Sequence, residues 1–328
     1  MFTKKMINFD GREALLIEGL EDYSLVDTFE CGQCFRHVRL TPDSEARCSP
    51  IAGESEYYVE YMTVVGERLV FVGQRNRSEL IFFGVGEDDF DELAEYFALK
   101  TDYGMIREDI LSRTDSEFLI NATSCAAGIR ILRQDPWETL FSFIISQNNN
   151  IPRIMGIIRK ISLQYGKNLA SSLGACPIEC GGFCKGSGEF NTDKCLSCGA
   201  CYTFPSASAV AKSPEGLLES RPGFRYKYLV DAAEKVLSGE VNLDEIYERH
   251  SYEYTLEQLQ KIKGVGEKVA SCASLFAFSN LNAFPIDVWM RRAIDEYFDG
   301  KLDPKTLGDY AGVAQQYIFH YIRALSKQ

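Results

Sequence analysis

The sequence contains no run of 18 consecutive apolar residues, so it offers no candidate for a membrane-spanning helix. Its first residues, MFTKKMINFDGREALL, lack the apolar stretch of a secretory signal peptide. No internal repeat of fixed period is visible either. These absences argue against a membrane protein, a secreted protein and a repeat array. We expect a cytoplasmic, monomeric protein that does not bind a membrane.

The chain is also short of positive charge. It has 35 Lys and Arg against 47 Asp and Glu, and the net charge of −12 disfavours binding to nucleic-acid phosphates. The acidic residues are concentrated, however. Residues 41–117 hold 18 acidic and 7 basic residues, whereas residues 139–178 hold 4 basic residues and no acidic one. The composition is therefore compatible with a DNA-binding surface outside the acidic region.

The first third of the chain has the composition of a β-sheet. Tyr57–Met62, Arg68–Val72 and Leu80–Val85 are predicted strands, and Asp89–Leu99 has the pattern of an amphipathic helix. From about residue 115 the pattern becomes helical. The predicted helices are Trp137–Ser146, Pro152–Tyr165, Gly223–Leu237, Leu256–Lys263, Lys268–Phe278, Val288–Phe298 and Gly308–Ser326.

The length of 328 residues suits two or three domains. We therefore predict an α+β fold in which a β-rich domain at residues 1–115 is joined to an all-α domain at residues 116–328. A cysteine-rich insertion at residues 174–203 is expected to interrupt the second domain.

A glycine turn and two polar residues form the most specific pattern. Gly264 and Gly266 lie in LQKIKGVGEKV (residues 259–269), between two apolar-periodic helices, where glycine permits a positive φ and a close approach to a ligand. Lys268 follows in the next helix as a candidate nucleophilic amine, and Asp287 comes 19 residues later, just after Pro285. A glycine turn, a helical lysine and a helix-capping aspartate are each ordinary. Their order and spacing are far more specific.

This hairpin occurs together with four further motifs. They are CGQCFR (31–36), RQDPWETLFSFIISQNNNIPRI (133–154), PGFRYKY (222–228) and AGVAQQYIF (311–319). In this order the five motifs resemble the 8-oxoguanine DNA glycosylases of the helix-hairpin-helix superfamily, most closely the clostridial and archaeal variety. The resemblance implies a TBP-like twisted antiparallel sheet in the N-terminal domain and an all-α helix-hairpin-helix body. The expected partner is double-stranded DNA containing 8-oxoguanine, in a bacterial or archaeal cell.

The resemblance also implies roles for individual residues. Lys268 would attack C1′ of the damaged nucleotide and form a Schiff base, and Asp287 would stabilise the developing sugar cation. The base would be swung out of the duplex into a pocket. This pocket would be formed by Gly32, Cys272, Gln315 and Phe319, with the Gly32 carbonyl accepting from N7–H, which guanine lacks. Catalysis would need no cofactor.

A second group would contact the duplex itself. By resemblance, Phe224 would fill the gap left by the lesion, and Asn148, Arg153 and Arg225 would hold the orphaned cytosine. Gly264 and Gly266 would lie against the DNA backbone. Trp289 departs from vertebrate members, which have a histidine there, so its role is open.

The cysteine-rich insertion is unlike the short connection of the family. A reducing cytoplasm disfavours disulfides, which leaves a metal site as the favoured interpretation. The preferred hypothesis is a structural zinc ion bound by Cys180, Cys184, Cys195 and Cys198. The alternative is an iron–sulfur cluster at the CxxCxxC of Cys195, Cys198 and Cys201.

Two other functions are compatible with parts of the pattern. A monofunctional alkylbase glycosylase would need only the aspartate, and Lys268 speaks against it. A non-catalytic hairpin module would bind DNA for a larger complex, and the complete set of pocket residues speaks against that.

Overall fold

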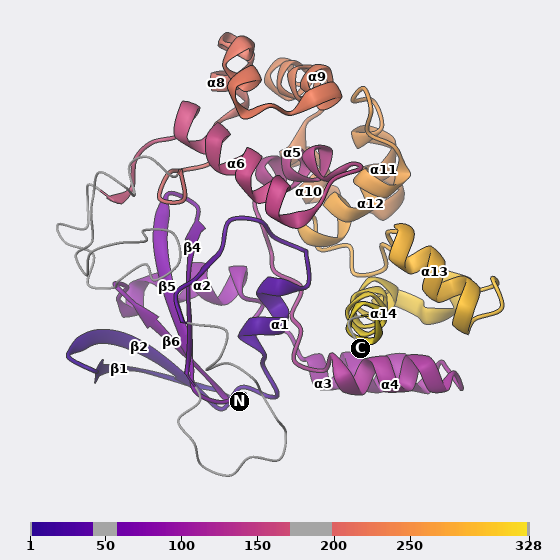
Figure 1. Cartoon of the computed structure of the whole chain (residues 1–328). Helices are drawn as coiled ribbons and strands as arrows, with labels where there is room; N and C mark the ends of the chain where they lie inside the picture. The colour runs from indigo at the N-terminus through magenta and orange to yellow at the C-terminus, as the bar shows by residue number, and fades with distance from the viewer. Residues whose placement is uncertain (1, 42–57, 171–198, 327–328) are drawn as a thin grey trace.

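The computed structural model of the chain describes residues 2–41, 58–170 and 199–326 (Figure 1). Within them, six strands form one antiparallel sheet in the order β1-β2-β6-β5-β4-β3. The strands are β1 (Thr3–Phe9), β2 (Arg12–Glu18), β3 (Val38–Arg39), β4 (Val59–Val65), β5 (Arg68–Gln74) and β6 (Glu79–Phe83). The sheet and the mainly helical remainder confirm the predicted α+β class.

Three strands, β4 to β6, were predicted within a few residues, whereas the β1–β2 hairpin was missed. Its turn is Asp10-Gly11, with φ values of +50° and +76°, and Phe9 pairs with Arg12 across it. Asp-Gly between two extended segments is a strong signal for such a two-residue turn. That dipeptide could therefore have located the hairpin.

Both faces of the sheet are covered. Leu15, Val70 and Phe82 pack on one face against α1 (Leu25–Glu30) and α2 (Phe90–Tyr96). On the other face, Leu16 and Phe71 pack with Ala170, which precedes the cysteine-rich insertion, and with Cys201 near the end of that insertion. The inner strands β4, β5 and β6 are therefore buried at nearly every position and show little alternation of burial, whereas the edge strand β1 is exposed or half-buried along its length.

A large helical body follows the sheet. Its helices are α3 (Tyr103–Ser112), α4 (Glu117–Cys125), α5 (Pro136–Ser146), α6 (Ile151–Tyr165), α8 (Ala207–Lys212), α9 (Tyr226–Ser238), α10 (Leu243–Arg249), α11 (Tyr252–Leu259), α12 (Glu267–Phe276), α13 (Val288–Tyr297) and α14 (Ala311–Leu325). Figure 1 shows α14 lying between α13 and the α3–α4 pair. In the described part of the chain, no helix has the length and apolarity needed to cross a membrane.

Two predicted helices differ from the structure in their boundaries. The helix before the glycine turn is α11, which starts at the Ser251 cap and ends at Leu259, four residues earlier than predicted at each end. The last helix begins at Ala311, because Gly308 has φ +69° and breaks a preceding 3-10 segment. In both cases a local cap or break overrides the apolar pattern. The domain division at residue 115 stays a prediction; α3, on its N-terminal side, contacts α4.

Candidate active site

The glycine turn connects α11 to α12 and is held tightly. Gly264 has φ +78°, and a Cβ atom there would lie 2.4 Å from the Tyr228 ring of α9. The Asp231 carboxylate, also on α9, accepts a hydrogen bond of 2.7 Å from the Lys263 N–H. Gly266 differs, because a Cβ atom there would meet no atom within 4 Å. The turn therefore packs on α9 at Gly264 and is open to a ligand at Gly266.

Lys268 is the second residue of α12, directly after this turn, and is half-buried. Its Nζ atom lies 5.4 Å from the centroid of the Phe143 ring, which stacks on Phe276. Cys272 follows one helical turn later and is buried. Burial raises the pKa of the Cys272 thiol, the nearby Lys268 charge and hydrogen bond lower it, and the Asp287 charge raises it. Lys268 and Asp287 are thus both near enough to Cys272 to influence its thiol.

Asp287 caps the N-terminus of α13. Its carboxylate accepts a hydrogen bond of 2.9 Å from the Met290 N–H, which fixes the side chain on the first turn of the helix. The negative charge of an aspartate at a helix N-terminus is stabilised by the helix dipole. The capping role and a chemical role are compatible, since the carboxylate also lines the groove described next.

An open groove of about 900 Å³ brings several predicted residues together. Lys268 and Asp287 line it with Asn148, Phe224 and Gly266. Its other lining residues are Ser146, Gln147, Asn149, Val269, Ile286, Val288, Trp289 and Arg291. The groove is thus lined by the charged groups of Lys268, Arg291 and Asp287. It is also lined by the apolar side chain of Phe224, which is half-exposed. Seven other predicted residues do not line this groove: Gly32, Cys272, Gln315, Phe319, Arg153, Arg225 and Gly264.

The Gly32 loop precedes the sheet's third strand and approaches α14. Gly32 has φ +88°, and a Cβ atom there would lie 3.6 Å from Ile151 Cδ1 and 3.8 Å from Phe319 Cε1. The next residue, Gln33, is fully buried; its amide donates to the carbonyls of Thr28 and Arg130 and accepts from the Leu132 N–H. These bonds fix the backbone of the loop. Gln33 was missed, although it lies inside the CGQCFR motif.

Gln315 and Phe319 lie one turn apart on α14. Gln315 is only 3% exposed, and its Oε1 atom accepts a hydrogen bond of 2.8 Å from Gln316. Phe319 is half-buried, and its ring lies near Gly32. The structure therefore brings the Gly32 loop and this face of α14 together.

The residues predicted to hold the opposite strand differ in exposure. Arg153 is exposed in the first turn of α6, whereas Arg225 is 2% exposed. The Arg225 guanidinium donates to the backbone carbonyls of Gln147, Asn148 and Pro222. Asn148 adopts a positive φ of +47°. In this structure Arg225 thus supports the turn that carries Asn148, which sequence analysis did not foresee.

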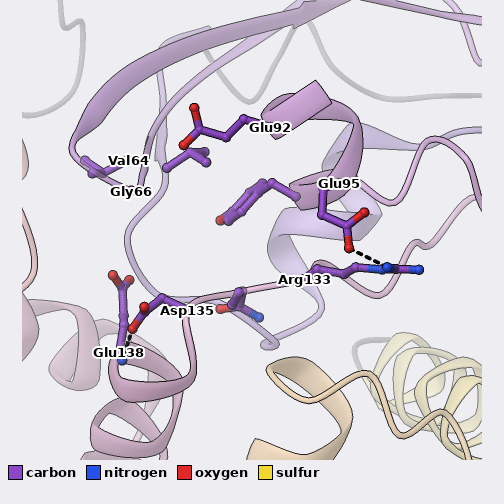
Figure 2. Close-up of a pocket in the computed structure, with 10 residues that line it drawn as sticks. Val64, Gly66, Glu92, Glu95, Arg133, Asp135 and Glu138 are labelled. Atoms are coloured by element: carbon purple, nitrogen blue, oxygen red, sulfur yellow. Dashed lines mark hydrogen bonds and ion pairs between the residues drawn. The ribbon is translucent and has the colours of Figure 1, made fainter. Parts of the chain in front are cut away.

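A second, smaller hollow of about 210 Å³ lies where the sheet meets the start of α5 (Figure 2). Four carboxylates line it, from Glu92, Glu95, Asp135 and Glu138. Burial raises the pKa of Asp135 and of Glu138. The Arg36 guanidinium, 2.9 Å from the Glu138 carboxylate, lowers the pKa of Glu138 in part. An acidic hollow does not suit a DNA phosphate. This hollow belongs to the contact between the sheet and the helical body.

The predicted zinc ligands Cys180, Cys184, Cys195 and Cys198 lie outside the described residues. Within residues 2–41, 58–170 and 199–326, no group of three or more His, Cys, Asp or Glu side chains is arranged to bind a metal. Cys201 is described and is 1% exposed, with its sulfur 3.9 Å from that of Met62.

A lysine that directly follows a glycine hairpin and shares a groove with an aspartate defines the class of helix-hairpin-helix DNA glycosylases that carry a catalytic lysine. Comparison with known proteins narrows this class. Residues 15–140 match the family model described as 8-oxoguanine DNA glycosylase, N-terminal domain. The solved structure of MBOgg1 with a low-affinity DNA ligand is 33% identical, covers 99% of both chains and superposes with a TM-score of 0.76. The chain therefore belongs to the 8-oxoguanine DNA glycosylase family.

Two further relatives agree with this assignment. The 8-oxoguanine glycosylase/lyase of Clostridium acetobutylicum, in its apo-form, is 31% identical over 98% of both chains, with a TM-score of 0.75. It has also been solved with double-stranded DNA containing cytosine opposite 8-oxoguanine. The Saccharomyces cerevisiae protein named N-glycosylase/DNA lyase is 27% identical over 285 residues. This match covers 82% of the present chain and 66% of the yeast protein.

The hairpin packing predicts different effects at two glycines with the same backbone conformation. Gly264 and Gly239 both have φ +78°, but a Cβ atom would meet Tyr228 at Gly264 and nothing within 4 Å at Gly239. We expect Gly264→Ala to lower the free energy of unfolding by about 1–3 kcal/mol more than Gly239→Ala, because of the steric overlap. Urea unfolding measures both values. Equal losses would show that the Tyr228 contact adds no constraint beyond φ.

Proposed function

We propose that the protein removes 8-oxoguanine opposite cytosine in duplex DNA and then cleaves the resulting abasic strand. The observation that carries this proposal is the groove shared by Lys268, directly after the glycine hairpin, and Asp287 at the start of α13. Membership of the 8-oxoguanine glycosylase family supports the choice of lesion.

The proposed reaction begins with the neutral amine of Lys268. Its nitrogen bonds to C1′ of the nucleotide while the bond between C1′ and the base breaks, and the base departs with that electron pair. Positive charge develops on the sugar at this stage, and the Asp287 carboxylate stabilises it. Opening of the sugar ring leaves a Schiff base between Nζ and C1′. The hydrogen bond from Met290 N–H supports this role, because it holds the carboxylate in place.

Strand cleavage follows from the same intermediate. The iminium draws electrons away from C2′, so a proton on C2′ becomes acidic and can pass to the departed base, which left with an electron pair. The bond between C3′ and its oxygen then breaks, and the 3′ phosphate leaves. This β-elimination requires no metal ion and no redox cofactor, since each step moves only a proton or an electron pair.

The damaged base would be read by groups from three segments. In this proposal the Gly32 carbonyl accepts from N7–H, Gln315 binds the pairing edge, and Cys272 and Phe319 lie on the two faces of the ring. The neighbouring positions of Gly32 and Phe319 support this arrangement. So does the position of Cys272 beside Lys268.

The opposite strand would be held at the other side of the groove. Phe224, half-exposed at its rim, suits an apolar wedge in the base stack. Arg153 is exposed and could reach cytosine. Burial lowers the pKa of Arg225, and the charge of Arg153 lowers it further. Arg225 would contribute through the turn at Asn148, whose carbonyl accepts from its guanidinium, as well as through its own donors.

The lysine assignment is tested by borohydride trapping on a duplex with 8-oxoguanine opposite cytosine. We expect Lys268→Gln to abolish base release and the trapped adduct while lesion binding is retained, because only the nucleophile is removed. Lys263→Gln is the matched control, since its exposed side chain lies on the other side of the turn. A borohydride-stable adduct with Lys268→Gln would mean that another amine is the nucleophile. A protein that releases the base without ever being trapped would be monofunctional.

Arg153 predicts a preference for the opposite base. Cytosine offers O2 and N3 as acceptors, whereas adenine presents its N6 donor. A good bidentate contact is worth about 1–3 kcal/mol of discrimination. We expect single-turnover excision to be at least about tenfold faster opposite cytosine than opposite adenine, and Arg153→Met to erode that preference. Lys160→Met, on the exposed face of the same helix, should leave it unchanged. If the unmutated protein excises 8-oxoguanine equally fast opposite cytosine and opposite adenine, Arg153 contacts only phosphates.

For the insertion we propose a structural zinc ion bound through Cys180, Cys184, Cys195 and Cys198. Burial of Cys201 against Met62 supports this set over the cluster that would use Cys201. Purified protein should contain about one equivalent of zinc by elemental analysis, and Cys195→Ser should lose it. Iron with visible absorption would favour the cluster instead, and metal-free active protein would exclude both.

A further inference from the structure

One face of α14 carries three side chains at helical spacing. Gln315, Phe319 and Arg323 are each four residues apart, so they project from the same face of the helix. The first two are assigned above to the damaged base. Arg323 continues the same line, and long helical side chains lean toward the N-terminus of their helix. This brings the guanidinium back toward Phe319, with its Cζ atom 5.2 Å from the centroid of that ring.

Arg323 also reaches the Gly32 loop. A Cβ atom on Gly32 would lie 3.9 Å from Arg323 Nη1, almost the same distance as from Phe319 Cε1. The charge of Arg323 acts on the neighbouring Cys31 as well. Burial raises the pKa of the Cys31 thiol to about 12, and Arg323 is among the groups that lower it. The guanidinium is therefore beside the backbone that would read N7 of the base.

The charge of Arg323 is not matched by an acidic partner. Across the described ranges of the chain, no carboxylate lies within 4.0 Å of its guanidinium, although it is half-buried. Arg249, above Tyr254, does have such a partner and pairs with Glu245 at 2.7 Å. Arg130 and Arg225, which also contact aromatic rings, donate instead to backbone carbonyls. The N–H donors of the half-buried Arg323 guanidinium are therefore not used by a carboxylate. Such a group is suited to bind an acceptor atom on a ligand.

We propose that Arg323 is a further specificity-determining residue that donates a hydrogen bond to the C8 oxygen of the flipped base. 8-Oxoguanine differs from guanine at two adjacent ring atoms: N7 carries a proton and C8 carries an oxygen. A donor beside the Gly32 carbonyl is therefore next to the position of the C8 oxygen. Guanine has a C–H group there and leaves the guanidinium without an acceptor. This inference rests on the proposed function, because it assumes that Gly32 and Phe319 bind the base.

Arg323→Met removes the donors and keeps a long apolar side chain beside Phe319. Two single-turnover rates are measured: base excision from an 8-oxoguanine:cytosine duplex, and cleavage of a preformed abasic site opposite cytosine. We expect excision to slow by at least about tenfold, as for the loss of one charge-assisted hydrogen bond. Abasic-site cleavage should stay within about twofold, since no base is present. The matched control is Arg249→Met. It removes an arginine of α10 that lies over the Tyr254 ring, and it should change neither rate.

A binding measurement separates base recognition from general DNA contact. In a Lys268→Gln background, the ratio of affinities for 8-oxoguanine:cytosine and guanine:cytosine duplexes should fall about tenfold when Arg323→Met is added. An unchanged ratio would overturn the inference, because Arg323 would then contact phosphates. Equal slowing of excision and abasic-site cleavage would also overturn it, by indicating a structural role. Failure of the unmutated protein to release 8-oxoguanine would refute the proposed function itself.

Discussion

The contact between Gly264 and the Tyr228 ring is the constraint on which the proposed chemistry depends. The turn closes against α9 only because position 264 has no Cβ atom. This closure determines that α12 begins at Glu267, and hence that Lys268 lies in its first turn. The Asp231 carboxylate reinforces the turn from the same helix. The position of Lys268, the proposed nucleophile, is thus set by the packing of the backbone.

Electrostatics explain how an acidic protein can present a face to DNA. Much of the acidity belongs to the sheet domain, where carboxylates pair with local arginines, as in Arg12–Glu60 at 2.9 Å and Arg75–Glu79 at 2.5 Å. Such pairs neutralise part of the negative field close to its source. The groove, by contrast, contains a single carboxylate, Asp287, among its lining residues. A polyanion therefore meets little repulsion there, although the net charge of the whole chain is −12.

Features that depend on neighbouring residues could be predicted, and features that depend on distant ones could not. The order of hairpin, Lys268 and Asp287 is local, and the structure brings the two side chains into one groove. The helix before the hairpin was placed four residues late, because the apolar pattern continues into the turn while the Ser251 cap fixes the true start. The orientation of Arg225 could not be predicted, since two of its three acceptors are carbonyls 77 and 78 residues away in sequence.

The Gly32 loop shows why the proposed recognition of the base depends on the whole fold. A backbone carbonyl can discriminate between two bases only if its position is fixed to a fraction of a hydrogen-bond length. Gln33 provides this rigidity by bonding to carbonyls and an N–H group on both sides of the boundary between the sheet and the helical body. Breaking those bonds would leave buried polar groups unsatisfied, at about 1–3 kcal/mol for each group. In the proposed mechanism, selectivity for the lesion is therefore coupled to the docking of the two parts of the molecule, because α14 can align Phe319 and Arg323 with Gly32 only while that docking holds.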